Sequence, residues 1–482
     1  MIGFLVLTRN WLRSIKPEKK ELLVMGGVLV VSGFFRLYRL KDLFFFSLDE
    51  EVIAFQVRQI ITGVHFPAIG VNAADTGLYL GPFYFYLAGP FFWIFRGEPV
   101  AGAVLAALIG VVTTGIVFKV GERLFSFGVG AVAALIHSIS LPVVLFERKF
   151  FNPTPGILIS ALILWCLAEI KIGRRQYWYG LVLCLGAILH INLAFGVYFV
   201  IAALWLWRSR FRPTRREIIG GMIALGIFVW PLVFFDLRHQ WFLSKEVIST
   251  LESGSKTLNL SSIKVMKPLV FLSKVPLMHL ASSNVIDEFS TGPAVTKNLP
   301  SGLGIGLLIA SGLWLVGTKK NINLKLMITA LLISGLALGM YPGFVQEYYG
   351  MVMVVPYLLL LARFLKAYSL VGGVVVATLI MLNMIQLVTI YNPHGLKRLE
   401  ALRSKILQET KGQKLNLLRA GSANYGWGMT YLLTQRGYPP NASFEDPILG
   451  FLYQHEKTKA DEENFLVFVV STRESIDAWI VP

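Results

Sequence analysis

Three consecutive carboxylates, Asp49, Glu50 and Glu51, follow the first stretch of this chain that is long enough to cross a bilayer. That stretch, residues 22–38, contains no acidic residue, and a basic segment precedes it. Because Lys and Arg are in excess on the cytoplasmic side of membrane helices, the carboxylates should emerge on the outer face. Carboxylates gathered at a membrane surface can take protons from a substrate, so the cluster indicates an enzyme.

The composition is typical of a polytopic membrane protein. Of 482 residues, 55% are hydrophobic and only 15% are charged. Much of the net charge of +17 lies in short loops between apolar runs, which indicates membrane topology and argues against nucleic acid as a partner. The lipid bilayer, with its anionic headgroups, is the partner expected for this charge. Cys166 and Cys184 fall inside apolar runs, so we expect neither a disulfide framework nor a cysteine zinc site.

Eleven apolar runs predict membrane helices, because only a helix satisfies its own backbone inside a bilayer. Every second loop is basic, which predicts a multi-pass protein of the cell membrane with a cytoplasmic N-terminus and an extracytoplasmic C-terminal domain. The expected spans are 22–38, 99–118, 128–146, 155–171, 177–190, 193–207, 217–235, 301–318, 326–342, 349–366 and 367–390.

The expected domains are a transmembrane module, residues 1–390, and an α/β domain, residues 391–482. Strand-like runs at 415–420 and 465–471 flank an amphipathic run at 425–436, which favours a small α/β fold for the second domain. This segment contains no phosphate-binding glycine loop, no HExxH motif and no nucleophile elbow.

The long outer loops of the transmembrane module are expected at 39–98 and 236–300. The first loop contains an aromatic block at 81–95, broken by Pro and Gly, which we expect to lie along the membrane surface. The second contains a lysine-spaced apolar stretch at 263–283, which is typical of an interfacial or re-entrant helix.

Four short motifs carry a resemblance to a known family. They are Asp49-Glu50 after the first span, Gly81-Pro82-Phe83-Tyr84 before the second, Asn152-Pro153 after the third, and Phe235-Asp236-Leu237-Arg238-His239 at the end of the seventh. In this order the chain resembles the GT-C membrane glycosyltransferases. More narrowly, it is similar to the protein O-mannosyltransferase-like family, which includes bacterial transferases of aminoarabinose to lipid A. The resemblance implies a GT-C-like, α-helical polytopic fold.

The resemblance also implies a reaction: a sugar passes from a polyprenyl-phosphate carrier to an acceptor on the outer face, with inversion at the anomeric carbon. A hydroxyl acceptor is a poor nucleophile, so a carboxylate must take its proton as the new bond forms. Asp49 matches the family's catalytic acid and is the expected base. Glu50 is expected to position or tune Asp49. The sequence identifies neither the sugar nor the acceptor, which could be protein, lipid or glycan.

The departing carrier phosphate needs cations around it more than it needs a proton donor. Arg238 is the first candidate, because family members use a basic residue near this helix exit and Arg can hold two phosphate oxygens at once. The remaining candidates are His239, Arg148, Lys149 and Arg58. Arg148 and Lys149 could equally be interfacial residues whose long side chains reach the headgroups.

Tyr84, Tyr86 and Asn152 are expected to contact the donor lipid or sugar, since flat rings pack well against both. Many relatives have a second Asp at the position of Asn152. No cofactor is required, although a divalent cation could be held between Asp49 and Glu147, because hard cations favour oxygen ligands.

Other polar residues have structural readings. Tyr348 and Tyr349 are expected in an interfacial aromatic belt, His190 and Asn192 among interhelical polar contacts, and His137 as a packed, neutral residue. The acidic triplet itself could be a solvated helix start.

Two other functional classes fit the topology. A transporter or flippase of a lipid-linked saccharide would also show many spans, but transporters usually hold ionisable residues at mid-membrane, whereas here they concentrate at the outer boundary. A scaffold displaying the C-terminal domain would leave the acids and Arg238 without a role.

Overall fold

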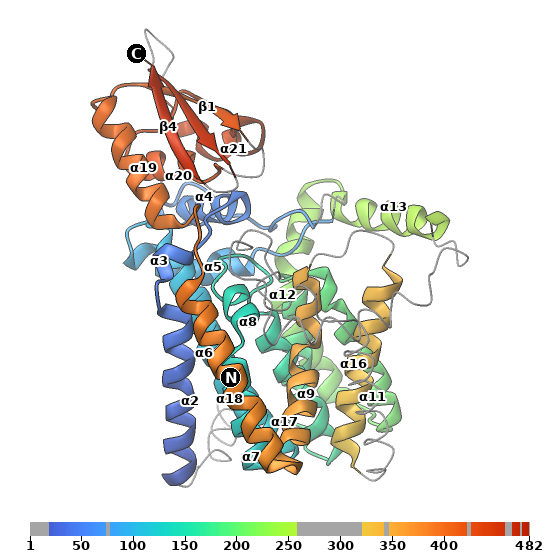
Figure 1. Cartoon of the computed structure of the whole chain (residues 1–482). Coiled ribbons are helices and arrows are strands. Elements are labelled where there is room, and N and C mark those ends of the chain that lie inside the picture. Colours follow the sequence, from blue (N-terminus) through green and yellow to red (C-terminus); the bar gives the residue numbers. More distant parts are fainter. Residues whose placement is uncertain are drawn as a thin grey trace.

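The computed structural model describes residues 19–73, 78–257, 321–341, 347–421, 426–457, 465–472 and 475–481. These residues form a helical bundle with a small sheet standing at one end (Figure 1). Below, we call this the α4 end of the bundle, after the helix that lies across it. The expected span 301–318 and the stretch 263–283 lie outside the described residues.

The bundle contains long and short apolar helices in chain order. They are α2 (Lys19–Leu37), α6 (Val100–Leu124), α7 (Phe127–Ile139), α8 (Leu141–Phe146), α9 (Gly156–Lys171), α10 (Tyr177–Ile188), α11 (Val197–Arg208), α12 (Arg215–Arg238), α16 (Ile322–Met340), α17 (Val354–Ala367) and α18 (Ser369–Thr389). Two 3₁₀ segments, η1 (Leu193–Gly196) and η5 (Glu347–Met353), precede α11 and α17.

Five helices in the described ranges are long and apolar enough to cross a membrane, which supports a multi-pass membrane protein. They are Val100–Leu124, Arg215–Arg238, Ile322–Met340, Tyr348–Ala367 and Ser369–Thr389. The total of eleven spans remains a prediction.

The expected single span 128–146 is wrong in detail, because the helix breaks at Ser140. Pro142 has no N–H to donate to the preceding turn, so α7 ends and α8 begins anew. The backbone N–H of Leu141 instead donates to the Asn383 side chain of α18 at 2.8 Å. A polar side chain from a distant helix thus accepts the hydrogen bond of a backbone N–H at the break.

Close helix contacts in the bundle depend on small residues. A side-chain carbon added at Gly121 of α6 would lie 2.7 Å from the Gly130 Cα of α7, so the two backbones approach as closely as glycine allows. The two helices share an extensive buried surface with α2.

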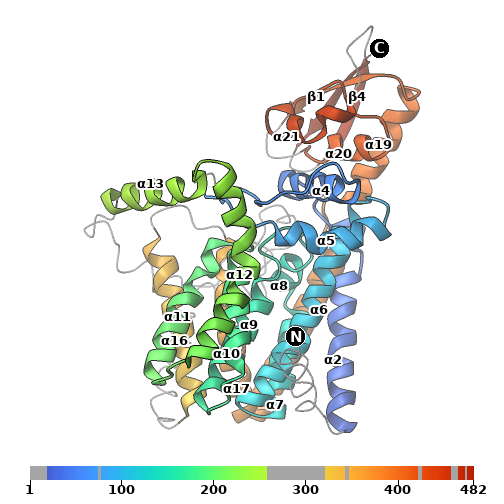
Figure 2. The same ribbon diagram turned by 180° about the vertical axis from the view of Figure 1, so that it is seen from behind.

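Four shorter helices lie at the α4 end: α3 (Leu40–Leu43), α4 (Leu48–Ile61), α5 (Phe83–Ile94) and α13 (Phe242–Thr257). Seen from behind, α4 and α13 run across the bundle rather than along it (Figure 2). The aromatic block expected along the membrane surface forms α5, a 12-residue helix that contains Pro90.

The C-terminal segment combines helices with a four-stranded sheet. The helices are α19 (Leu396–Glu409), α20 (Met429–Gln435), α21 (Asp446–Tyr453) and the 3₁₀ segment η6 (Gln454–Glu456). The strands are β1 (Leu415–Gly421), β2 (Ala442–Ser443), β3 (Phe465–Ser471) and β4 (Ile476–Val481), in the order β2-β1-β3-β4. β1 is parallel to β2 and β3, and β3 is antiparallel to β4. The register pairs Leu417 with Val467, both buried.

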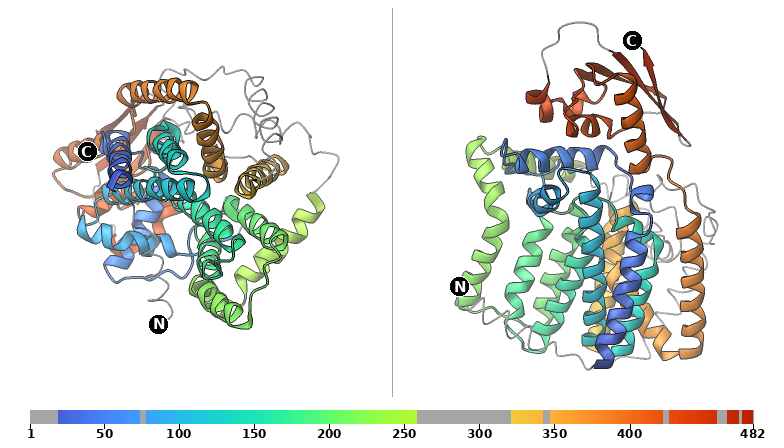
Figure 3. Two further views of the ribbon diagram at one scale, coloured as in Figure 1. Left: turned by 90° about the horizontal axis from the view of Figure 1, so that it is seen from below. Right: turned by 90° about the vertical axis from the view of Figure 1, so that its left-hand side faces the viewer.

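The C-terminal segment packs directly on α4 (Figure 3). Phe55 of α4 packs edge-on against Tyr431, with ring centroids 5.0 Å apart, and stacks on Tyr453 at 5.5 Å. The Gln59 amide donates to the Leu452 carbonyl at 2.7 Å. The helix that carries the acidic triplet is therefore held between the bundle and the sheet.

Candidate active site

The acidic triplet forms the first turn of α4, and its three carboxylates lie in different surroundings. Ser47 is the N-cap, and Glu50 completes a capping box by accepting from the Ser47 hydroxyl and from the Ser47 N–H at 3.1 Å. Glu50 and Glu51 are fully buried, whereas Asp49 is exposed. Only Asp49 is therefore presented to a solvent-borne substrate.

Glu51 points into the C-terminal segment, a contact that the sequence did not suggest. Its carboxylate accepts from the backbone N–H groups of Gly428 at 2.7 Å and Tyr431 at 2.8 Å, at the start of α20. Burial, and secondarily the neighbouring Glu445, raise the pKa of Glu51 well above its usual range. Glu51 thus fixes the first turn of α4, two residues from Asp49.

An aromatic and polar group lies beside Asp49. Asp49 is within electrostatic reach of Tyr348 in η5, and the Asn192 side chain is hydrogen-bonded to Tyr348. The Tyr348 ring packs edge-on against Phe151 at 5.5 Å, and the Lys149 ammonium lies over Phe151 at 5.1 Å. Four separate chain segments therefore meet here. Sequence reasoning assigned Tyr348 and Asn192 to structural roles, and only their distant neighbours reveal this placement.

The turn that carries Lys149 is anchored by Glu147. Arg36 of α2 forms an ion pair with Glu147 and donates from Nε at 3.0 Å. His137 Nε2 lies 3.3 Å from the other Glu147 oxygen, and Thr114 contacts His137 Nδ1 at 2.9 Å. All four side chains are completely buried. The sequence did not suggest this network, because its partners come from different helices.

The expected cation site would use Asp49 and Glu147, whose carboxylates have different surroundings. Glu147 is committed to Arg36 and His137, while Asp49 is exposed beside Tyr348. Within the described ranges, no group of three potential metal-ligating side chains is found. A cation shared by these two carboxylates remains a prediction.

Arg148 follows directly and is 3% exposed. Its Nη2 donates to the Tyr38 carbonyl at 2.8 Å, whereas Nε and Nη1 have no partner among the described residues. A buried guanidinium with unused donors is costly unless an anion completes it. Of the expected phosphate-binding cations, Arg148 and its neighbour Lys149 lie in the turn next to the Asp49 surroundings.

The other expected cations have different environments. Arg58 is held by Glu456, with contacts of 3.1 and 2.8 Å between its guanidinium and the two carboxylate oxygens, so it joins α4 to the C-terminal segment instead of lying open for a phosphate. Arg238 is exposed over the Phe234 ring at 5.4 Å, and His239 stacks on Phe235 at 3.9 Å. Both lie at the α4 end, at the exit of α12 (Figure 2), but no described contact joins them to Asp49.

The residues expected to contact the donor lipid or sugar also lie in different surroundings. Tyr84 is 2% exposed, within electrostatic reach of Glu50. Tyr86 donates to the Pro67 carbonyl at 2.9 Å, and the Asn152 amide donates to the Ile191 carbonyl. In this structure Tyr86 and Asn152 therefore stabilise loops, and Tyr84 forms part of the buried layer next to α4.

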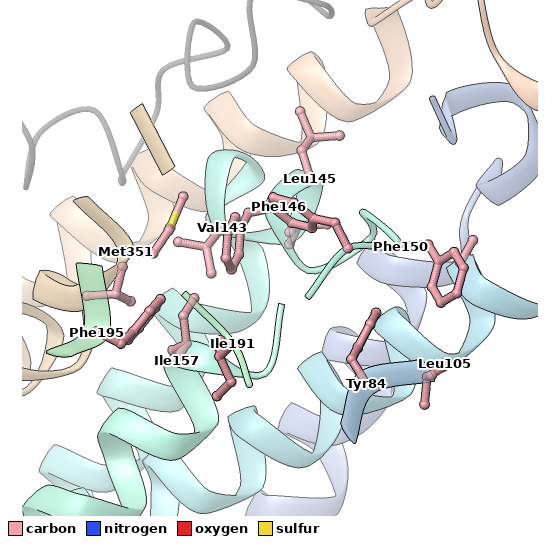
Figure 4. Packing of buried hydrophobic residues seen from close by; sticks show 14 of the residues in the cluster. Tyr84, Leu105, Val143, Leu145, Phe146, Phe150, Ile157, Ile191, Phe195 and Met351 are labelled. Atoms are coloured by element: carbon pink, nitrogen blue, oxygen red, sulfur yellow. The ribbon is translucent and has the colours of Figure 1, made fainter. Parts of the chain in front are cut away.

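The buried layer that contains Tyr84 packs against the 147–152 turn through Phe150 (Figure 4). Phe150 packs on Tyr84, with ring centroids 5.5 Å apart, and on Phe92 at 5.2 Å. On the other side, the Phe195 ring occupies the space that a side chain at Gly156 would need. Close apolar packing at Phe150 and at Gly156 thus fixes both ends of the segment between these two residues.

The Gly81-Pro82-Phe83-Tyr84 motif has a packing explanation. A side chain at Gly81 would overlap the His190 ring. His190 Nε2 donates to the Phe228 carbonyl of α12 at 2.8 Å, and Nδ1 accepts from the Phe83 N–H at 3.2 Å. The glycine therefore lets one histidine join α5, α10 and α12.

Comparison with known proteins bears on this arrangement. Residues 80–234 match the model of the family described as dolichyl-phosphate-mannose-protein mannosyltransferase. Comparison with curated proteins gave no sequence match. The structure is similar to that of ArnT from Cupriavidus metallidurans bound to undecaprenyl phosphate, with 12% identity, a TM-score of 0.56 and 94% of both chains covered. The apo state of ArnT matches at 13% identity and a TM-score of 0.56, covering 93% of this chain and 92% of that one. The resemblance to the GT-C glycosyltransferases is confirmed.

The segment matched by the family model covers only part of the candidate site. Residues 80–234 include Tyr84 and the 147–152 turn, whereas Asp49, Arg238 and Tyr348 lie outside this segment. The similarity to the ArnT structures extends over nearly the whole chain, and at 12% identity it shows the fold alone. The roles of individual residues in this GT-C-like chain must therefore come from their own contacts.

Proposed function

We propose that this protein is an inverting glycosyltransferase that moves a sugar from a polyprenyl-phosphate carrier to an acceptor hydroxyl at the outer face of the membrane. One observation carries the proposal. Of three consecutive carboxylates, Asp49 alone is exposed, at a rigidly capped helix start beside a turn that holds Lys149 and the incompletely bonded Arg148. This arrangement supports Asp49 as the base, with Lys149 and Arg148 as cations for the phosphate.

In the proposed step, Asp49 takes the proton of the acceptor hydroxyl as its oxygen attacks the anomeric carbon. The bond between that carbon and the phosphate oxygen breaks, and the polyprenyl phosphate leaves with the bonding electrons. Attack from the face opposite the leaving group inverts the anomeric centre. Glu50 and Glu51 hold the first turn of α4 through their own hydrogen bonds, so Asp49 keeps a fixed position.

The leaving phosphate requires positive charge as it departs. Arg148 is the best-supported candidate, because its guanidinium is buried and retains unused donors among the described residues. Lys149 can add a second charge from the same turn. Arg238 and His239 remain candidates for the carrier at the exit of α12, and the ArnT structure to which this fold is similar is bound to undecaprenyl phosphate.

The alternation of basic loops supports the assignment of the α4 end to the outer face, with the N-terminus cytoplasmic. Labelling a cysteine introduced at Ser47 with a membrane-impermeant reagent tests this side directly. Labelling from the cytoplasmic side alone would overturn the topology.

The test of function is turnover of labelled polyprenyl-phosphate sugars in native membranes that contain the wild type, Asp49→Asn or the control Asp477→Asn. Asp477 is an exposed carboxylate paired with Lys405, at 2.8 Å, on β4. We expect release of free lipid phosphate from one donor by wild type and control, and a loss of at least about 100-fold in Asp49→Asn. Equal turnover by a folded Asp49→Asn protein would exclude Asp49 as the base. ATP- or gradient-dependent movement of an intact donor across the membrane without turnover would favour a transporter.

A further inference from the structure

A polar pocket lies at the α4 end, with a lining that shares no residue with the surroundings of Asp49. It has a volume of about 240 Å³ and forms where the ends of α2 and α18 meet α3 and the start of α19. Its lining residues are Arg39, Asp42, Tyr391, Asn392, Lys397 and Arg398.

The walls of this pocket are fixed by contacts between segments about 350 residues apart. Arg39 donates from Nη1 to the carbonyls of Val388 at 3.0 Å and Ile390 at 3.1 Å. The Leu396 N–H donates to the Phe44 carbonyl at 2.9 Å, and the Asn392 amide donates to the Leu43 carbonyl at 3.3 Å. The pocket is therefore a built junction and not a gap between loose loops.

The lining carries an excess of positive charge. Asp42 is the only carboxylate among the six, and it is shared by Arg39 Nε at 3.5 Å and Lys397 Nζ at 3.4 Å. Arg398 stacks its guanidinium over the Tyr391 ring at 4.2 Å, which fixes the plane of the group while leaving its edge donors available for hydrogen bonds. Three cations thus face one anion, and the pocket is suited to a further negative charge.

The position and size of the pocket restrict its occupant. α18, which is long and apolar enough to cross a membrane, ends at Thr389, and α2, an expected span, ends at Leu37. We therefore expect the pocket at the level of the lipid headgroups. Its volume is below that of pockets for drug-sized ligands, but it can hold a phosphate group. Planar guanidinium groups pair well with phosphate oxygens.

We propose that this pocket binds the phosphate group of an anionic lipid at the bilayer surface. The bound phosphate would bridge α3, which leads into α4 and Asp49, and α19, which leads into the C-terminal sheet. A lipid headgroup would thereby stabilise the junction that orients the two parts. The proposal depends on the charge and position of the pocket and is independent of the proposed sugar transfer.

The test uses the full-length protein in detergent, with phosphatidylglycerol, phosphatidylcholine or inorganic phosphate added. The variant Lys397→Gln/Arg398→Gln removes two cations from the pocket. The control Lys411→Gln/Lys414→Gln removes two exposed cations from the same C-terminal segment, outside the pocket. Bound lipid is measured by native mass spectrometry, and the melting temperature without lipid checks that each variant is folded.

We expect wild type and control to retain phosphatidylglycerol in preference to phosphatidylcholine. The pocket variant should bind phosphatidylglycerol at least about tenfold more weakly, from roughly 1 kcal/mol for each basic residue. Equal retention of phosphatidylglycerol by the pocket variant and the wild type would overturn the site. If inorganic phosphate alone raises the melting temperature of the wild type but not that of the pocket variant, and no lipid is retained, the pocket is confirmed and its ligand is free phosphate.

Discussion

Glu51 of α4 and Glu445, the residue before α21, are in hydrogen-bond contact, and both side chains are completely buried. The Thr430 N–H donates to Glu445 at 3.3 Å, while Glu51 accepts from Gly428 and Tyr431. Two adjacent buried carboxylates cannot both ionise cheaply, so the pair retains a proton that the unfolded chain would lose. This proton lies at the contact between the helix that carries Asp49 and the C-terminal sheet.

The first prediction concerns pH. Burial raises the pKa of Glu445 to about 7 from a value of 4.5, even though its hydrogen bonds and Arg419 act in the opposite direction. Because the folded protein binds this proton more tightly, the stabilising contribution is complete below about pH 4.5 and is lost as the pH rises to about 7. Wild type should therefore lose stability across this window.

Glu445→Gln should remove this dependence and raise the stability at pH 8 by about 1–3 kcal/mol. The measurement is the melting temperature in detergent between pH 5.5 and pH 8, with the exposed Glu409→Gln as the control. A parallel decline with pH in Glu445→Gln and wild type would contradict the role of the pair.

The second prediction concerns the buried network of Arg36, His137 and Glu147. Arg36→Met leaves Glu147 buried without its guanidinium partner and should cost about 3–5 kcal/mol. The double variant Arg36→Met/Glu147→Met should cost clearly less than the sum of the single variants. Arg208→Met, at an exposed position in the last turn of α11, should change stability by less than about 0.5 kcal/mol. Additive effects in the double-mutant cycle would show that the two residues do not interact.

The third prediction concerns Gly81. A methyl group there would overlap the His190 ring, so Gly81→Ala should destabilise the protein by about 1–3 kcal/mol. Gly89→Ala, within α5, meets no atom within 4 Å and should be neutral or stabilising. Thermal unfolding of the two variants compares the same substitution at two nearby positions, and similar midpoints would rule out the close contact.

The fourth prediction compares Arg148 and Arg58 as binding residues for the carrier phosphate. Arg148→Gln removes a buried guanidinium whose Nε and Nη1 have no partner in the part of the chain that the structure describes. It should raise the KM for the polyprenyl-phosphate donor by about 30-fold, corresponding to roughly 2 kcal/mol for a charge-assisted contact. Arg58→Gln breaks the contact with Glu456 and should leave this KM within about threefold, since Arg58 serves the C-terminal junction.

Steady-state kinetics with a fixed acceptor measures both variants. An unchanged KM in a folded Arg148→Gln protein would transfer the phosphate-binding role to Lys149 or Arg238. A large increase in KM in Arg58→Gln would mean that Arg58 contacts the carrier despite its ion pair.

Several parts of the fold could be predicted from local sequence. The apolar runs predicted the bundle helices with small boundary shifts, and the β-rich runs at 415–420 and 465–471 correspond to β1 and β3. These signals work because periodicity and composition act over a few residues. The break at Ser140 was missed, since its compensation by Asn383 comes from a distant helix.

The sequence by itself determined that this is a membrane protein with an acidic helix start, because bilayer thickness and backbone hydrogen bonding leave few choices for such apolar runs. Tertiary structure decided which carboxylate is exposed. Glu50 is hydrogen-bonded to Ser47 and Glu51 to the backbone at the start of α20, whereas Asp49 is exposed. It also joined Arg36 to Glu147 and Arg58 to Glu456. Burial and pairing depend on segments hundreds of residues apart, so no local pattern specifies them.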